Sequence, residues 1–409
     1  MRSLLTRALP WLAVALIVLG AWWLWPGGDA ARPRLLDPAA LAAALPADGE
    51  DSFAALDTTA DWTPELPQDL GPHPAFRTEL WDLTGQLRAD DGRRYGLRLT
   101  LVRLGLRAPS EDGGRASGLA ADALLLGRFA LVPEDGDPLR AERASRTAAG
   151  LAGATTDPPE VWLEDWRLRS GGADSAGGPA AGRLAVAAEG ARLELALTSE
   201  KAPVTPAASL LTGGAGAPGG QDRGPAFRWL AQPRLGLSGR LLREDAETRV
   251  SGSAWLDHVW GGAGGAGVGL AGTRGQLALN RFLLQLDDAS ELLCIQLRRR
   301  AGGGTPVPTC LVIAPDGGTR VLQRRALTLA PKEATWRSSD GAATYPVAWR
   351  LAAPGLDLSL DIRALQPDQE IMLGERLWSG AVAVEGERAG QPVAGGGRMD
   401  LSGYAPADG

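Results

Sequence analysis

Short stretches of alternating apolar and polar residues occupy most of the chain from residue 71 onward. Turn residues separate these stretches at intervals of about ten residues. Thr248–Trp255 and Leu356–Ala364 are two such stretches, and Asp91-Gly92 stands between two others as a hairpin turn. No strong amphipathic-helix pattern interrupts them. The pattern therefore predicts an all-β protein made of barrels or sandwiches.

The first 25 residues follow a different pattern. Arg2 and Arg7 precede an uncharged apolar run from Ala8 to Trp25, which is typical of an N-terminal transmembrane or signal helix. Bulky Trp residues end this run where a cleavage site would have small residues, which favours an uncleaved anchor over a cleaved signal peptide. Both interpretations export the rest of the chain to the periplasmic or extracellular face. An uncleaved anchor would hold it at the inner membrane.

Composition shifts divide the remaining chain. Residues 26–66 are rich in Ala, Pro, Asp and Gly and read as a tether. Residues 67–230 and 231–409 each contain a series of expected strands, and a low-complexity loop at residues 205–225 precedes the boundary. Val161–Trp166 (VWLEDW) also resembles Ala254–Trp260 (AWLDHVW). We therefore expect two related barrel-like domains that pack together.

Charge and cysteine content narrow the possible partners and cofactors. The net charge is −6 and no basic patch stands out, so nucleic acid is not an expected partner. Cys294 and Cys310 lie in apolar runs on either side of a Gly/Pro turn, where they form either a disulfide or two buried thiols. The chain has no C-x-x-C or Cys/His spacing and only two histidines. We therefore expect no metal and no cofactor.

The stretch Val250–Gly272 carries the densest candidate chemistry. It places Trp255, Asp257, His258 and Trp260 within six positions and ends in a run of Gly and Ala. Because side chains alternate along a strand, Asp257 and His258 would point to opposite faces. His258 would then need another partner, and Glu79 and Asp165 are the candidates.

Six sequence motifs, in order, resemble those of one known family. They are GPHPAFRTELWDLTG at 71–85, VWLEDW at 161–166, GSAWLDHVWG at 252–261, FLLQLDD at 282–288, TYPVAWRL at 344–351 and LSGY at 401–404. The chain thus resembles the AttH-like, CrtC-like proteins, often called predicted secreted hydrolases, which include carotenoid 1,2-hydratases. The resemblance implies two lipocalin-like β-barrel domains with a site, between or within them, for apolar substrates.

The chain departs from this family's usual motifs at several positions. Where the family reads R-T-E-W-W-Y, this chain has Leu80 and Asp82 in place of a Trp and the Tyr. Val259 stands where the family has Glu or Asn. The segment Leu279–Phe282 replaces the family's W-D-W-F, so both Trp and the Asp are absent. These changes indicate a partly dismantled catalytic surface.

Candidate site residues follow from these motifs. Hydration of an alkene needs a carboxylic acid of raised pKa and a base that activates water, while Trp rings stabilise a developing cation. The acid–base candidates are Asp257, His258 and Glu79. The ligand-binding candidates are His73, Trp81, Asp165, Trp166, Trp255, Trp260 and Asn280. Structural roles such as a turn cap for Asp257 or a backbone anchor for His73 remain open.

Three functions are consistent with the sequence. The first is binding of a lipid or other apolar small molecule at the outer face of the inner membrane. The second is a hydratase or hydrolase acting on an apolar substrate, such as an isoprenoid, with Asp257 and His258 as acid–base groups. The third is an accessory subunit of a membrane transporter. The altered family motifs favour binding, and the sequence leaves enzymatic activity open.

Overall fold

The computed structural model describes residues 53–56, 62–109, 121–172, 181–207, 210, 227–243, 246–261, 277–300, 306–372 and 376–405. Every described residue belongs to one compact unit, Leu36–Gly409. The expected N-terminal helix, most of the expected tether and the Gly-rich run after Gly261 lie outside the described residues. Within the described ranges, no helix is long and apolar enough to span a membrane.

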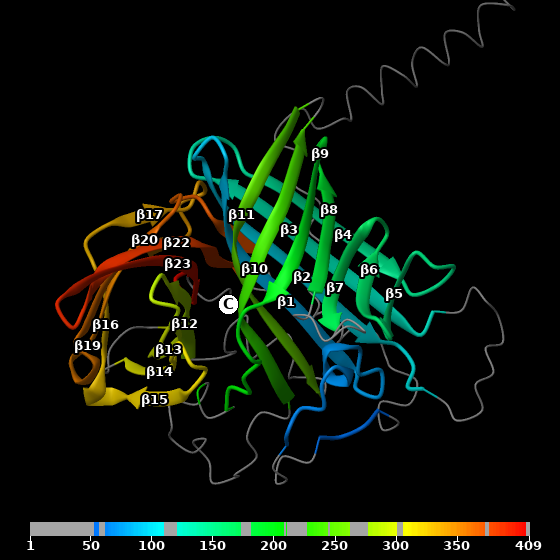
Figure 1. The fold of residues 1–409 in the computed structure, drawn as a ribbon, viewed down its shortest axis with the longest axis horizontal. Coiled ribbons are helices and arrows are strands. Elements are labelled where there is room, and N and C mark those ends of the chain that lie inside the picture. Colours follow the sequence, from blue (N-terminus) through cyan, green and yellow to red (C-terminus); the bar gives the residue numbers. More distant parts are fainter. Residues whose placement is uncertain are drawn as a thin grey trace, which may run out of the picture. The chain divides into compact units, whose positions relative to one another are not determined.

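Eleven antiparallel strands form the first sheet (Figure 1). They are β1 (Thr78–Ala89), β2 (Arg94–Gly105), β3 (Ala123–Pro133), β4 (Leu139–Arg146), β5 (Ala152–Thr156), β6 (Pro159–Leu163), β7 (Trp166–Gly172), β8 (Ala181–Ala188), β9 (Ala191–Ser199), β10 (Phe227–Arg243) and β11 (Ala246–Gly261). Their order is β4-β3-β2-β1-β11-β10-β9-β8-β7-β6-β5. Strands β3 and β4 approach β5, β6 and β8, so the sheet curls into a nearly closed barrel.

Ten strands form the second sheet, which curves as a half-barrel. They are β12 (Leu277–Leu286), β13 (Glu291–Arg299), β14 (Val307–Ile313), β15 (Thr319–Gln323), β16 (Thr328–Pro331), β19 (Ala348–Ala353), β20 (Leu358–Ala364), β21 (Glu370–Met372), β22 (Arg376–Arg388) and β23 (Gln391–Ser402). Strands β17 (Thr335–Arg337) and β18 (Thr344–Pro346) pair separately. Short 3-10 turns occupy Gln68–Leu70, Arg324–Ala326 and Pro354–Leu356.

The all-β prediction is confirmed, but strand pairing does not follow the expected division after residue 230. That position lies inside β10, and both β10 and β11 are hydrogen-bonded into the first sheet. The second sheet begins only at Leu277. The reason is that β11 pairs with β1 along twelve residues, from Thr78↔Gly261 to Ala89↔Val250, and so completes the barrel. This pairing places the candidate stretch Val250–Gly261 beside the motif at the start of β1.

Alternation along β1 and β11 supplies two different cores. Trp81, Leu83 and Leu256 join a large apolar cluster that fills the inner face of the first sheet. Their neighbours Leu80 and Val259 belong to another apolar cluster, which also contains Leu279 and Leu293 from the second sheet. The second sheet has a core of its own. Each of these two strands therefore carries one face of the barrel interior and one face of the interface between the sheets.

The two cysteines lie directly opposite each other on β13 and β14. Cys294 and Cys310 form a disulfide and are buried in the core of the second sheet. Of the two states left open by the sequence, the structure therefore contains the disulfide.

Candidate functional site

Five side chains gather on the inner face of the first sheet, at one end of β1 and β11. Glu79 lies opposite Trp260, and Trp81 lies opposite His258 in the strand register. His73 joins them from the segment before β1 and contacts both Glu79 and Trp260. We call these five residues the inner cluster. Their gathering confirms the expected alternation, because Asp257, next to His258, faces the other way.

Glu79 is the hydrogen-bonding centre of the inner cluster. Its Oε1 atom accepts the backbone N–H of His73 at 2.9 Å and lies 3.0 Å from His73 Nδ1 and 2.9 Å from His258 Nε2. Arg103 Nε donates to the other carboxylate oxygen at 2.9 Å. Of the two partners expected for His258, the structure therefore brings Glu79 into contact.

Asp69 holds the outer nitrogen of each histidine ring. Its Oδ1 atom lies 3.0 Å from His73 Nε2, and its main-chain oxygen lies 3.1 Å from His258 Nδ1. Arg103 fixes the same segment by donating to the main-chain oxygens of His73 and Phe76, at 2.9 and 2.7 Å. These hydrogen bonds hold the segment before β1 against the end of the barrel.

Burial and hydrogen bonding act in opposite directions on the two ionisable groups at the centre. Burial alone would raise the pKa of Glu79, but hydrogen bonds from His258 and His73 and the charge of Arg103 hold that pKa below its ordinary value. Burial lowers the pKa of His258, and the neighbouring Glu79 offsets that effect only in part. The carboxyl group is thus the anionic member of the inner cluster.

Indole rings enclose the two histidines. His73 stacks on Trp260 with 3.8 Å between ring centroids and 4° between planes. Trp81 stacks on His258 at 4.9 Å, and the edge of Trp62 meets Trp260 at 5.3 Å. His258 and Glu79 are buried, whereas the His73 side chain keeps 15% of its surface exposed. His73 is therefore the side of the cluster that solutes can approach.

A second buried polar cluster lies on the opposite face of β1 and β11, between the sheets. Its members are Asp82, Arg98, Asp257, Arg281, Arg398 and Asp400, and we call them the outer cluster. Arg398 contacts Asp82 at 2.5 Å and Asp400 at 2.6 Å, and Arg281 contacts Asp400 at 2.7 Å. Because β1 and β2 supply Asp82 and Arg98 while β12 and β23 supply the last three, the outer cluster joins the two sheets.

The charged groups of the outer cluster shift one another's pKa values. Burial opposes ionisation of Asp82 and Asp400, but the neighbouring arginines, Arg398 foremost, hold the pKa of both carboxyl groups below the ordinary value. Burial, reinforced by the charge of Arg398, lowers the pKa of Arg98 to about 10. Asp82, Asp400 and Arg98 therefore remain charged near neutral pH.

Asp257 differs from the other carboxyl groups of the outer cluster. Its Oδ1 atom accepts hydrogen bonds from the indole N–H groups of Trp255 at 2.6 Å and Trp229 at 2.9 Å. Among the described residues, its Oδ2 atom has no hydrogen-bond partner and lies 3.5 Å from Arg281. Burial outweighs these contacts and raises the pKa of Asp257. This is the environment expected for a carboxylic acid that donates a proton, although the side chain does not contact His258.

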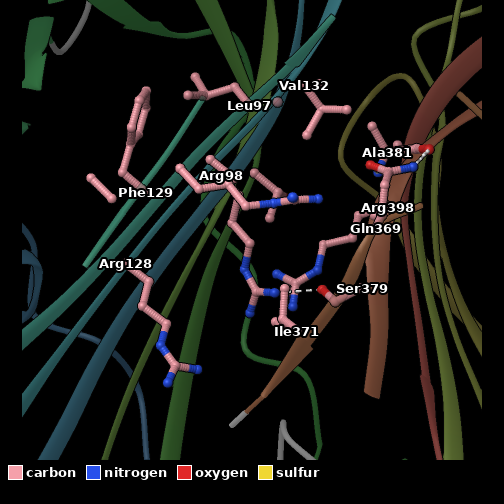
Figure 2. Close-up of a pocket in the computed structure, with 18 of the residues that line it drawn as sticks. Leu97, Arg98, Arg128, Phe129, Val132, Gln369, Ile371, Ser379, Ala381 and Arg398 are labelled. Atoms are coloured by element: carbon pink, nitrogen blue, oxygen red, sulfur yellow. Dashed lines mark hydrogen bonds between the residues drawn. The ribbon is translucent and has the colours of Figure 1, made fainter. Parts of the chain in front are cut away.

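A cleft opens between the sheets beside the outer cluster (Figure 2). Strands β1 to β4 line one side, and β21, β22 and β23 line the other. Apolar side chains, including Leu97, Phe129 and Ile371, share the lining with four arginines and one glutamate. Arg98 donates to Ser379 across the cleft, and Ser379 donates to Asp400 at 2.6 Å. The cavity measures ≈ 90 Å³, which is small beside the roughly 300–1,000 Å³ of pockets that enclose drug-sized ligands.

Three expected ligand-binding residues lie elsewhere. Asp165 sits in the turn between β6 and β7, where it pairs with Arg143 rather than with His258. Trp166 packs in the core of the first sheet and donates to the main-chain oxygen of Ala187 at 2.9 Å. Asn280 is buried on β12 and donates to Gln296 at 3.1 Å. None of these three side chains joins the inner cluster or lines the cleft.

Sequence reasoning missed several partners of the expected residues. Asp69 and Arg103 complete the inner cluster, and Arg98, Arg281 and Arg398 build most of the outer cluster. One signal was available for Arg103: it lies opposite Glu79 in a hairpin that Asp91-Gly92 predicts. For Arg281 and Arg398, chain distance hides the contacts, since 316 residues separate Asp82 from Arg398.

Comparison with known proteins agrees with the fold. The model of the AttH-like family matches residues 57–404. The crystal structure of an AttH protein from Nitrosomonas europaea is similar, with a TM-score of 0.65 and 27% identity, covering 87% of this chain and 100% of that one. Kievitone hydratase from Nectria haematococca has a TM-score of 0.55 and 13% identity, covering 86% of this chain and 96% of that one. Among curated proteins, no sequence matches.

Proposed function

The chain belongs to the AttH-like family, and from this premise we propose that it binds a small amphipathic molecule in the cleft between its two sheets. The observation that supports this proposal is the lining of that cleft. Leu97, Phe129 and Ile371 offer an apolar surface, while Arg98 and Arg398 offer guanidinium groups beside it. Such a lining suits a ligand with an apolar body and a carboxylate or phosphate head, because guanidinium pairs closely with both anions.

The size of the cleft limits the ligand. A cavity of ≈ 90 Å³ holds a head group and the first part of a chain, but not a whole lipid or carotenoid. Buried apolar side chains pack against one another on the inner face of the first sheet. We therefore propose a small amphiphile, or one end of a longer molecule whose remainder stays outside.

Ligand recovery and titration test this proposal. Extraction of the purified protein followed by mass spectrometry should recover an amphiphile, and a fluorescent fatty-acid analogue should bind in titration. Ile371→Asp should weaken that binding at least tenfold, because it places a carboxylate against an anionic, apolar ligand. Arg167→Met, which changes an exposed arginine on β7, is the matched control and should leave it unchanged. Failure to bind any amphiphile, or equal binding by Ile371→Asp, would refute the proposal.

A hydratase or hydrolase acting on an apolar substrate is the second candidate. The observation that favours it is Asp257, a buried carboxyl group held by two indole N–H groups with its second oxygen free of hydrogen bonds. One neighbour in fold is itself a hydratase, of kievitone. Incubation with isoprenoid alkenes should then give a product heavier by one water. Activity that survives both Asp257→Asn and His258→Ala would exclude this assignment.

We propose that the apolar run at residues 8–25 keeps the protein at the inner membrane, with the barrel on the outer side. The arginines at its start and the tryptophans at its end support this orientation. Membrane fractionation and protease protection of intact cells test it. A role as an accessory subunit of a transporter stays a prediction, and co-purification with a membrane complex would be its test.

A further inference from the structure

The inner cluster has a hydrogen-bonding pattern that neutral side chains cannot satisfy. His73 lies between Glu79 Oε1 and Asp69 Oδ1, and His258 lies between Glu79 Oε1 and the main-chain oxygen of Asp69. A carbonyl or carboxylate oxygen accepts hydrogen bonds and donates none, whereas a neutral imidazole has only one N–H. In each ring, therefore, one nitrogen lone pair faces an oxygen unless a positive centre lies between them.

The outer contacts decide which nitrogen is left over. If each ring donates to Asp69, the free lone pairs are those of His73 Nδ1 and His258 Nε2, and both point at Glu79 Oε1. Histidines that bind metals almost always donate their other N–H to a carboxylate or a backbone carbonyl. Asp69 provides one acceptor of each kind. The second layer of a metal site is thus already in place.

From this arrangement we propose that His73 Nδ1, His258 Nε2 and the Glu79 carboxylate bind a divalent transition-metal ion of the Zn²⁺ class. These three ligand atoms lie within 4.8 Å of one another. The two contacts at Glu79 Oε1, 3.0 and 2.9 Å, come close to the separation of about 3.3 Å between ligands 2.0–2.1 Å from a tetrahedral zinc ion. Two imidazoles and one carboxylate suit Zn²⁺, Co²⁺ or Fe²⁺ and disfavour Mg²⁺ and Ca²⁺, which take oxygen ligands.

The alternative to a metal ion is a second proton on the imidazole ring of each histidine. That would place two imidazolium ions 5.3 Å apart, centroid to centroid, beside the Arg103 guanidinium, so that three cations would share the carboxylates of Glu79 and Asp69. One metal ion places the same positive charge on an atom that all three ligands contact directly. The partly exposed side of His73 leaves a route by which the ion can enter.

This inference does not rest on the proposed ligand cleft, since none of the three metal ligands lines that cleft. The sequence predicts no metal, because the chain has only two histidines and no Cys/His spacing, but the fold places both histidines beside one buried carboxylate.

Cobalt substitution is the direct test, because the chain has only two histidines and both belong to this site. Protein without a polyhistidine tag is stripped with chelator and titrated with Co²⁺. We expect one Co²⁺ per chain, visible d–d absorption bands of nitrogen- and oxygen-ligated cobalt, and displacement by Zn²⁺. Circular dichroism of each sample confirms that the protein is folded.

Variants separate this site from adventitious binding. His73→Ala, at the exposed side of the cluster, should abolish the bands while the fold persists, and Glu79→Gln should do the same. Asp69→Asn should weaken binding about 10–100-fold, because it changes the partner of one ligand only. Glu247→Gln, which changes an exposed acid on β11, should have no effect. Folded protein that binds no Co²⁺, or unchanged binding by His73→Ala, would overturn the proposal.

Discussion

The two polar clusters lie on opposite faces of the same two strands, and they are built differently. The inner cluster gathers two histidines, one carboxylate and two indoles from β1, β11 and the segment just before β1. The outer cluster gathers arginines and aspartates from both sheets. In the inner cluster a ring nitrogen of each histidine meets the same carboxylate oxygen, while in the outer cluster carboxylates mostly meet guanidinium groups. The comparison shows two uses of buried polar groups: ion pairs of the outer cluster join the two sheets, whereas the histidines of the inner cluster converge on one carboxylate.

The largest test of this comparison is Asp82→Ala, which removes a central anion from the outer cluster. It leaves Arg398 and Arg98 short of a partner in a buried site, so we expect the free energy of unfolding to fall by about 3–5 kcal/mol. Urea denaturation followed by tryptophan fluorescence measures it. Glu247→Gln, at an exposed position, should give no measurable change. A loss below 1 kcal/mol would show that the outer cluster does not hold the sheets together.

The pH dependence of stability is a second test of the ion pairs in the outer cluster. The folded-state pKa of Asp400 lies below its unfolded value near 3.8, so its contribution to stability is complete above about pH 4 and is lost as the pH falls through the folded value. Asp400→Asn should therefore cost about 3 kcal/mol at pH 7 and progressively less below pH 4. Unfolding curves at several pH values test this. A cost that is constant from pH 7 to pH 2.5 would contradict the ion-pair interpretation.

His73→Ala probes the inner cluster and should cost less. It removes contacts with Glu79 and Asp69, and hydrogen bonds to charged groups contribute about 1.5–3 kcal/mol each. Because His73 is partly exposed, water can replace those contacts, so we expect a loss of about 2 kcal/mol. Measured without metal, a loss larger than that of Asp82→Ala would reverse the comparison.

Ser379→Ala should have the smallest effect. It removes the hydroxyl that accepts from Arg98 and donates to Asp400, but leaves every arginine–carboxylate pair of the outer cluster intact. We expect a loss of about 1 kcal/mol in thermal or urea unfolding. If the free energy of unfolding falls as much as in Asp82→Ala, the outer cluster is stabilised mainly by hydrogen bonds of the hydroxyl group and not by its ion pairs.

The alternation of side chains along the strands predicted part of the candidate site. It placed Asp257 and His258 on opposite faces and left Glu79 and Asp165 as candidate partners of His258. The structure confirms the opposite faces and brings Glu79, but not Asp165, to His258. The alternation did not reveal Asp69, because nothing in the pattern shows that the segment before β1 folds back over the end of the barrel. Nor did it reveal that β10 and β11 belong to the first sheet, since pairing between distant strands leaves no local signal.

The departures from the family's motifs also gain a different meaning. Asp82 and Arg281 both stand where the family usually has an aromatic residue, and the sequence alone indicated loss of a catalytic surface. In the structure these two side chains lie 3.5 Å apart, across the interface between the sheets. In this chain the two positions therefore form an ion pair. Only the three-dimensional contact could show that they belong together.

The pairing of β1 with β11 also constrains the order in which the first sheet can assemble. Glu79 on β1 and His258 on β11 are 179 residues apart. At 5–20 residues per second, synthesis of the chain between them takes about 9–36 s, so β1 is made well before its partner strand. During that interval this edge of β1 is open to any other strand. The last strand to join the first sheet also brings the last ligand of the inner cluster. Metal binding would therefore report that the barrel has closed, and it would favour the closed chain over every earlier state.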